Sequence, residues 1–144
     1  MKVLFDTNVV LDVLLAREPF AHTAARLLSI VDSGRVEGVV CATTVTTIHY
    51  IASKAVGRDR AHKHVDALMS IFDVAPVDRQ VLVDAMRPGF ADFEDAVLHQ
   101  AAVASGADAI VTRNGQDFAG ATLPVFDPPA LLAAILVENQ RSTD

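Results

Sequence analysis

Five carboxylates, in three groups, are the residues of this chain best suited to chemistry. They are Asp6, then Asp92, Glu94 and Asp95, and then Asp117. Asp6 directly follows the apolar run 2–5, which has the character of a buried first strand. In an α/β fold, a residue at the carboxyl end of such a strand faces the crevice where ligands bind. Several carboxylates that converge on one crevice most commonly hold a hard divalent cation such as Mg²⁺ or Mn²⁺ for phosphate chemistry.

Each of the first two groups also has a purely structural interpretation. Asp6, Thr7 and Asn8 are all good helix N-caps, and taken alone their capping and metal-binding interpretations are about equally favoured. Asp92, with Asp95 three residues later, resembles a capping box, and capping is the favoured interpretation of Asp92. Three acids within four residues nevertheless repel one another, and a bound cation would relieve that repulsion.

A polar segment after the predicted strand 109–111 supplies the remaining candidates. Thr112, Asn114 and Asp117 are placed to surround the same ion, and Arg113 is a candidate for contacting a phosphate. The alternative is an ordinary polar loop with a turn at Asn114.

Three further polar residues give weaker signals. His99 lies one helical turn after Asp95 and is interpreted as a partly exposed histidine rather than a ligand. Asp12 lies one turn after Asn8 and either supports that group or faces solvent. His62 and His64 are two residues apart on a helix, so they point to different faces and do not form a metal pair.

Alternating apolar patterns predict a parallel sheet covered by helices on both faces, within a single domain over residues 1–137. Predicted strands are 2–5, 39–41, 73–75, 109–111 and 124–126, and predicted helices are 9–16, 20–33, 44–56, 59–71, 78–86, 93–105 and 128–137. The helix at 44–56 is expected to be capped by Thr43 or Thr44, and the polar tail 138–144 is expected to fray. If strands 2–5 and 109–111 flank the switch point, Asp6 faces the loop 112–117 across the crevice.

Composition narrows the class of protein. The chain has 144 residues, of which 51% are hydrophobic, and a formal net charge of −6. That charge argues against a broad basic face for nucleic acid, but not against a nuclease whose metal ions supply positive charge. Cys41 is the one cysteine, so no internal disulfide can form and a reducing cytoplasm is the natural setting. We expect Cys41 to be an inert core thiol. Acidic and amide residues interrupt the first apolar run, which excludes a signal-peptide core.

Four segments, in order, resemble the motifs of the PIN domain, the metal-dependent ribonuclease fold of many prokaryotic, VapC-like toxin–antitoxin toxins. They are Asp6–Asp12, Thr43–Tyr50, Asp92–Ala96 and Thr112–Asn114 with Asp117–Phe118, and the chain closes with Pro124–Pro128 in the usual way. The resemblance covers essentially the whole chain. It implies a three-layer α/β/α sandwich and endonucleolytic cleavage of RNA.

The resemblance also implies roles for particular residues. Asp6, Asp95 and Asp117 match the acids that carry catalysis, with Asn114 assisting, and Mg²⁺ or Mn²⁺ is the implied cofactor. A further acid is missing, because Thr47 stands where the family usually has a glutamate. Threonine binds hard cations poorly, so either Glu94 or Asp92 replaces it as a ligand or the activity is weakened.

Partners follow from the same resemblance. An RNA substrate, a small antitoxin protein and a homodimer are implied, with no membrane association. Arg58, Arg60 and Lys63 form the densest basic patch and are candidates for lining the groove of that dimer, although a solvated helix face explains them equally well.

Two other classes of protein remain to be weighed. A phosphatase of the haloacid-dehalogenase type also begins with a strand that ends in Asp, but it needs a second Asp where this chain has Asn8. A catalytically weakened PIN domain that binds RNA or a protein is favoured by the missing glutamate. The retained Asp6, Asp95 and Asp117 argue against it.

Overall fold

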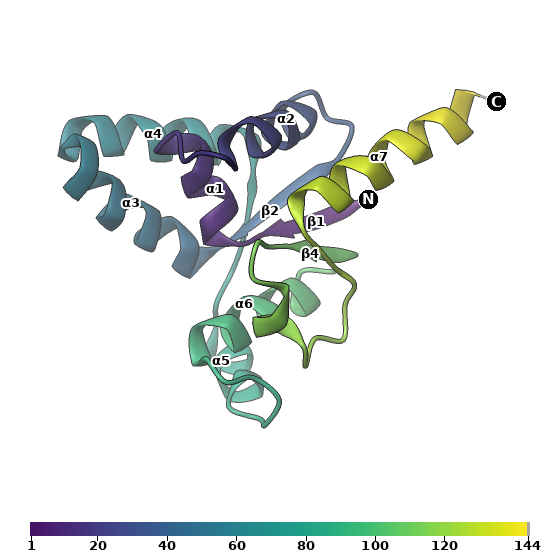
Figure 1. Ribbon diagram of the computed structural model, residues 1–144. Helices are drawn as coiled ribbons and strands as arrows, with labels where there is room; N and C mark the ends of the chain where they lie inside the picture. Colours follow the sequence, from purple (N-terminus) through teal and green to yellow (C-terminus); the bar gives the residue numbers. More distant parts are fainter. Residues whose placement is uncertain (144) are drawn as a thin grey trace.

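The computed structural model of the protein describes residues 1–143, and its centre is a five-stranded parallel sheet. The strands are β1 (Lys2–Phe5), β2 (Glu37–Cys41), β3 (Asp73–Ala75), β4 (Ala109–Val111) and β5 (Val125–Phe126). Their order across the sheet is β3-β2-β1-β4-β5, and every neighbouring pair is parallel. The doubly wound topology therefore places β1 at the centre, with β2 on one side and β4 on the other (Figure 1).

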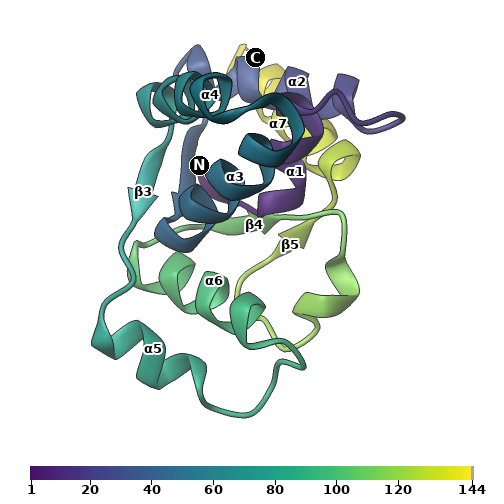
Figure 2. The ribbon, with the colours of Figure 1, turned by 90° about the vertical axis from the view of Figure 1, so that its left-hand side faces the viewer.

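Helices cover both faces of this sheet, which confirms the three-layer α/β/α architecture (Figure 2). One face carries α1 (Thr7–Leu14), α2 (Ala21–Asp32), α3 (Ala42–Val56), α4 (Arg58–Ile71) and α7 (Pro128–Thr143). The other face carries α5 (Arg79–Ala85) and α6 (Phe93–Ala104), and a 3-10 turn, η1 (Gly115–Phe118), follows β4.

The alternation of side chains along β1 explains why both faces must be covered. Val3 and Phe5 are buried in one hydrophobic core, whereas Leu4 is buried in the other. Successive side chains of a strand point to opposite faces, so a strand that is apolar throughout needs helices on both sides. Gly38 of β2 is packed equally tightly. A Cβ there would lie 2.6 Å from Val31 and 2.7 Å from Phe72, so a side chain does not fit at this position.

The switch point of the sheet lies where the sequence predicts it. Phe5 at the end of β1 is in register with Val111 at the end of β4, and the Asp6 N–H donates to the Val111 carbonyl at 2.9 Å. The residues that follow β1 and β4 therefore emerge side by side at the carboxyl edge of the sheet.

Two helix boundaries differ from the predicted ones. Helix α3 begins at Ala42 with Cys41 as its N-cap, and neither Thr43 nor Thr44 caps it. The predicted capping by threonine was therefore wrong. Helix α7 continues to Thr143 instead of ending near residue 137, so the polar segment 138–143 is helical rather than frayed.

Within the described residues, no helix is both long enough and apolar enough to cross a membrane.

Candidate functional site

Asp6 is the most firmly held of the candidate acids. Its side chain is 7% exposed, and it caps α1 because its Oδ1 accepts the Thr7 N–H at 2.7 Å. Its Oδ2 accepts a hydrogen bond from the Thr112 hydroxyl at 2.7 Å. The capping interpretation of this position is therefore confirmed, and Asp6 is also fixed against the loop after β4.

Asn8 ties the two loops together. Its Nδ2 donates to Asp6 Oδ2 at 3.3 Å, and its Oδ1 accepts the Arg113 N–H at 3.4 Å. The Thr112 hydroxyl in turn accepts the Asn114 N–H at 3.1 Å. These contacts fix the backbone of the loop after β4 against the start of α1, as the sheet topology predicts.

Asp95 and Asp117 bring the negative charge of two further segments to this edge. The pKa of Asp95 is raised to about 7, first by burial and then by the charges of Asp6, Asp92, Asp117 and Glu94. The pKa of Asp6 is also raised, mainly by burial, with Asp117 adding to the effect while Thr112, Thr7 and Arg113 oppose it. These effects agree with the sheet topology, which brings the starts of α1 and α6 and the turn η1 to the same edge. Asp92 accepts the Asp95 N–H at 3.1 Å, so it is the N-cap of α6, as favoured from the sequence.

The donor set suits a hard cation, although its side chains are not already gathered around a common point. Carboxylate and amide oxygens are the ligands that Mg²⁺ and Mn²⁺ prefer, and a cation would relieve the repulsion that raises the Asp95 pKa. In the part of the chain that the structure describes, no three His, Cys, Asp or Glu side chains lie close enough together to hold an ion. Glu94, Asn114 and Asp117 are exposed, and Asp95 is half-buried.

Arg113 has a different partner from the phosphate considered for it. Its Nε and Nη2 donate to the two carboxylate oxygens of Asp12, at 2.6 and 3.2 Å. Asp12 is completely buried, so it does not face solvent, and its carboxylate is paired with Arg113. The guanidinium also lies 4.0 Å from the centre of the Phe20 ring. No sequence pattern pointed to Phe20, because its contact with Arg113 depends on the turn between α1 and α2 reaching the loop after β4.

The histidines also differ from their predicted environments. His99 is 2% exposed rather than partly exposed, and its Nε2 accepts the Thr122 N–H at 3.0 Å. Burial lowers the pKa of His99, and its Nδ1 has no hydrogen-bond partner among the described residues. His62 does not pair with His64 but contacts His49 of α3, with 2.8 Å between ring nitrogens.

The start of α3 adjoins the site through two hydroxyl groups. Thr44 is buried, and its Oγ1 lies 3.0 Å from Oγ1 of Thr7, the residue after Asp6. Thr47 is three residues further along the same helix, and residues three apart share a helix face. Thr47 therefore follows Thr44 on the next turn, as a half-buried neighbour of the site.

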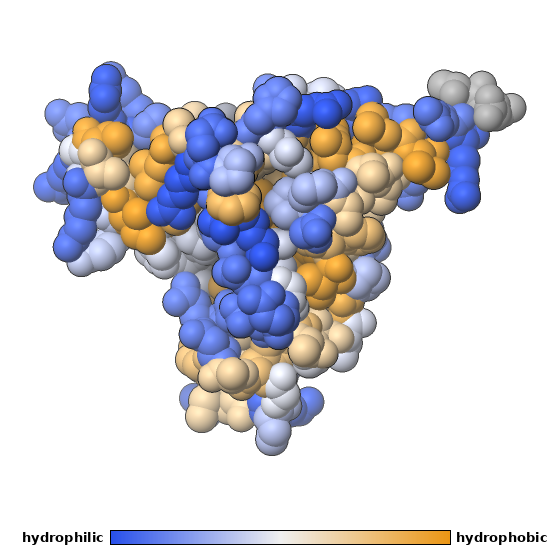
Figure 3. Space-filling model, viewed as in Figure 1, coloured by the Kyte–Doolittle hydropathy of each residue, from blue (hydrophilic) through white to orange (hydrophobic). Residues whose placement is uncertain are grey.

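The basic patch of Arg58, Arg60 and Lys63 is remote from these acids within one chain. It lies at the start of α4, where the turn from α3 projects away from the sheet (Figure 1). The face at the carboxyl edge of the sheet shows a hydrophilic band between two more hydrophobic areas (Figure 3). In a monomer, the basic patch therefore does not line the acidic edge.

Burial of Asp95, together with repulsion by the neighbouring acids, makes stability depend on pH in a predictable direction. The pKa of this acid is about 7 in the folded chain and about 3.8 in an unfolded one, so the folded state binds more protons between those pH values. Its contribution to stability is complete below about pH 4 and is lost as pH rises through about 7. In metal-free buffer, we expect the melting temperature of Asp95→Asn, relative to wild type, to rise from pH 4.5 to pH 7.5. The exposed Asp66→Asn variant is the control, and a difference for Asp95→Asn that does not change with pH would contradict the raised pKa of Asp95.

The fold and its edge define a class of protein, a doubly wound α/β/α domain in which Asp6 and the loop after β4 meet at the switch point of the sheet. A family model described as "PIN domain" matches residues 2–116, and the chain belongs to this PIN domain family. No curated protein matches the chain significantly.

Solved structures with the same fold come from toxin–antitoxin complexes and toxins. A chain of the VapBC2 complex from Rickettsia felis, bound to a promoter DNA fragment, matches with a TM-score of 0.68 at 13% identity, covering 88% of this chain and 98% of that one. A chain of a toxin-antitoxin complex from Klebsiella pneumoniae matches with a TM-score of 0.67 at 22% identity, covering 88% and 97%. VapC20 of Mycobacterium tuberculosis, described as a sarcin-ricin loop cleaving toxin, has a TM-score of 0.61 at 15% identity, covering 75% and 86%.

Proposed function

We propose that this protein is a metal-dependent endoribonuclease that hydrolyses RNA phosphodiester bonds as the toxin of a toxin–antitoxin pair. The observation that carries the proposal is the sheet topology of this PIN-domain chain, which brings Asp6 beside the loop after β4 that bears Asn114 and Asp117. The raised pKa of Asp95, caused first by burial and then by Asp6 and other acids, agrees with its lying near the same edge.

Each residue of the proposed site has a distinct task. Asp6 is held by Thr7 and Thr112, so it offers a fixed oxygen at the end of β1. Asp6, Asp95 and Asp117 are the proposed catalytic acids, and the ligands of Mg²⁺ or Mn²⁺ would be Asp6, Glu94, Asp95, Asn114 and Asp117. A divalent cation, when bound, lowers the pKa of a water and stabilises negative charge on a phosphate. Cys41 is buried and free, so it does not offer a thiol nucleophile at this edge.

The similar proteins support the nuclease class and the kind of partner. PIN-domain nucleases generally use divalent metals, and one structural neighbour is described as cleaving the sarcin-ricin loop, which is RNA. Other neighbours are complexes of a toxin with its antitoxin, so we infer a small antitoxin protein as partner. A homodimer is part of the proposal, because the basic patch on α4 can approach the acidic edge only from a second chain.

The proposal is tested by incubating the purified chain with a labelled single-stranded RNA in Mn²⁺ or in EDTA. We expect discrete RNA fragments in Mn²⁺ and intact RNA in EDTA. Intact RNA under both conditions, while the same preparation binds RNA, would favour the weakened binding domain suggested by Thr47. Cleavage that persists in EDTA would contradict metal dependence.

The absence of an acid at Thr47 gives a second prediction. A carboxylate added one turn from Thr44 would increase the negative charge near Asp6, so we expect Thr47→Glu to tighten Mn²⁺ binding and raise cleavage by up to about tenfold. Glu94→Ala should weaken both, because Glu94 is the acid expected to replace the missing ligand. Calorimetric titration with Mn²⁺ and RNA cleavage measure the two effects, and the exposed Glu138→Ala variant is a control at the far end of the chain. Weaker metal binding by Thr47→Glu, with no change in Glu94→Ala, would show that Glu94 does not compensate.

A further inference from the structure

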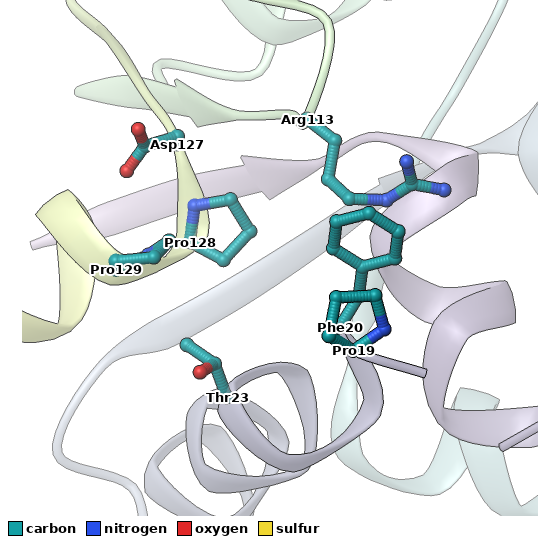
Figure 4. A pocket seen from close by; sticks show the side chains of 7 residues that line it. All are labelled: Pro19, Phe20, Thr23, Arg113, Asp127, Pro128 and Pro129. Atoms are coloured by element: carbon teal, nitrogen blue, oxygen red, sulfur yellow. The ribbon is translucent and has the colours of Figure 1, made fainter. Parts of the chain in front are cut away.

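A pocket of about 330 Å³ opens beside the acidic edge and has no part in the proposed metal site. It lies between the turn after α1, the first turn of α2, the loop after β4 and the start of α7 (Figure 4). Its lining residues are Pro19, Phe20, Thr23, Arg113, Asp127, Pro128 and Pro129. This volume lies within the roughly 300–1,000 Å³ of sites that hold small molecules or parts of larger ones.

The walls of this pocket are rigid and flat. Three of the lining residues are prolines, whose rings fix the backbone. Phe20 is an aromatic ring that is 40% exposed, so a ligand in the pocket can contact it. Figure 4 shows the planar Arg113 guanidinium against the Phe20 ring, with the Pro128 ring across from it. Rigid planar walls suit a flat ligand, because little side-chain freedom is lost on binding.

Arg113 joins this pocket directly to the acidic edge. Its N–H donates to Asn8, which in turn donates to Asp6, while its side chain lies on Phe20. The Arg113 backbone thus contacts the Asn8 side chain, which contacts Asp6, while the Arg113 side chain lines the pocket. A chain molecule bound at Asp6 would present its next unit to the pocket.

The hydrogen-bonding state of Arg113 indicates what that unit is. Two of its five N–H donors bind Asp12, and the other three have no acceptor among the described residues. The buried Asp12 carboxylate already compensates its positive charge. Arg113 therefore offers donors and a planar surface more than it offers net charge, which suits the uncharged acceptors of a base better than a phosphate.

We propose that this pocket binds a nucleobase of single-stranded RNA, adjacent to the phosphate at the acidic edge. This inference rests on the proposed ribonuclease function and specifies its substrate class. A base reaches such a pocket only when it is free of its own helix, so the substrate is a loop or an unpaired strand. The base lies against the walls formed by Phe20 and the prolines and accepts hydrogen bonds from N–H groups of Arg113.

The experiment compares variants on two walls of the pocket. Phe20→Ala removes the ring and Thr23→Trp fills the pocket, whereas Phe20→Tyr keeps an aromatic ring. Met69→Ala removes a side chain of α4 that is 46% exposed and serves as the control. Binding of a fluorescent eight-nucleotide RNA is measured by anisotropy in EDTA, and cleavage of the same RNA is measured in Mn²⁺. Thermal melting verifies that each variant is folded.

We expect Phe20→Ala and Thr23→Trp to weaken RNA binding by about tenfold or more, the usual effect of losing one base–aromatic stack, and to raise KM for cleavage. Phe20→Tyr and Met69→Ala should bind like wild type. If Phe20→Ala does not fold, Thr23→Trp alone decides the matter.

The outcomes separate this inference from the proposed function. If both pocket variants are active and have the RNA affinity and KM of the wild type, the nucleobase assignment is overturned. The pocket would then be a candidate site for a side chain of a protein partner. Weakened binding in the pocket variants of a protein that never cleaves would support the pocket and contradict the nuclease. A wild-type protein that binds no RNA contradicts both.

Discussion

Replacement of Asp6 by asparagine is expected to lower RNA cleavage by more than about 100-fold while leaving the fold intact. Even residues that only support a metal ligand typically contribute 10–100-fold, so loss of the central carboxylate should exceed that. The fold is expected to survive because asparagine caps helices as well as aspartate does, and the Thr112 hydroxyl can accept a hydrogen bond where it now donates one.

Initial cleavage rates in Mn²⁺, with melting curves of the same preparations, measure this effect. Asp66→Asn makes the same chemical change at an exposed position of α4 and should cleave like wild type. Wild-type turnover by Asp6→Asn would place the chemistry elsewhere. A large fall in melting temperature would instead make Asp6 a structural residue.

Replacement of Arg113 by methionine is expected to lower the free energy of unfolding by about 3–5 kcal/mol. Asp12 is completely buried and has both carboxylate oxygens bonded to Arg113, so the change leaves a buried charge without its partner. Part of the loss also comes from the Phe20 ring, which no longer lies under a cation.

Urea unfolding of a double-mutant cycle isolates the ion pair. Asp12→Leu combined with Arg113→Met removes both charges. The double variant should therefore lose less free energy of unfolding than Arg113→Met alone. The exposed Arg26→Met on α2 is the control and should change stability by no more than about 0.5 kcal/mol. An Arg113→Met variant as stable as this control would mean that the ion pair contributes nothing.

Much of the architecture was predictable, because local patterns determine it. The apolar runs 2–5 and 109–111 are followed by helix-capping or turn residues, and alternating strand and helix patterns permit few topologies. The adjacency of β1 and β4 follows from that topology, and it brings Asp6 beside Thr112 although they are 106 residues apart.

The errors lie where tertiary contacts override local signals. From its position one turn after Asn8, Asp12 could have faced solvent. Its burial is explained by its pairing with Arg113, which is 101 residues away in the sequence. Thr43 and Thr44 are good caps in isolation, but α3 begins at Ala42 and Thr44 contacts Thr7 instead. His99 has an ordinary helical setting in the sequence, and its burial depends on Phe90 and Thr122 from two separate loops.

The proposal that a cation binds at the acidic edge is tested most directly by locating the ion in a crystal. Crystals of the protein grown with Mn²⁺ can be measured at a wavelength where manganese scatters anomalously. We expect one strong anomalous peak within contact of Asp6, Asp95 and Asp117, with Glu94 or Asn114 turned toward it. A map in which manganese is absent from this edge, or lies only at another surface such as the His49–His62 pair, would contradict the proposed site.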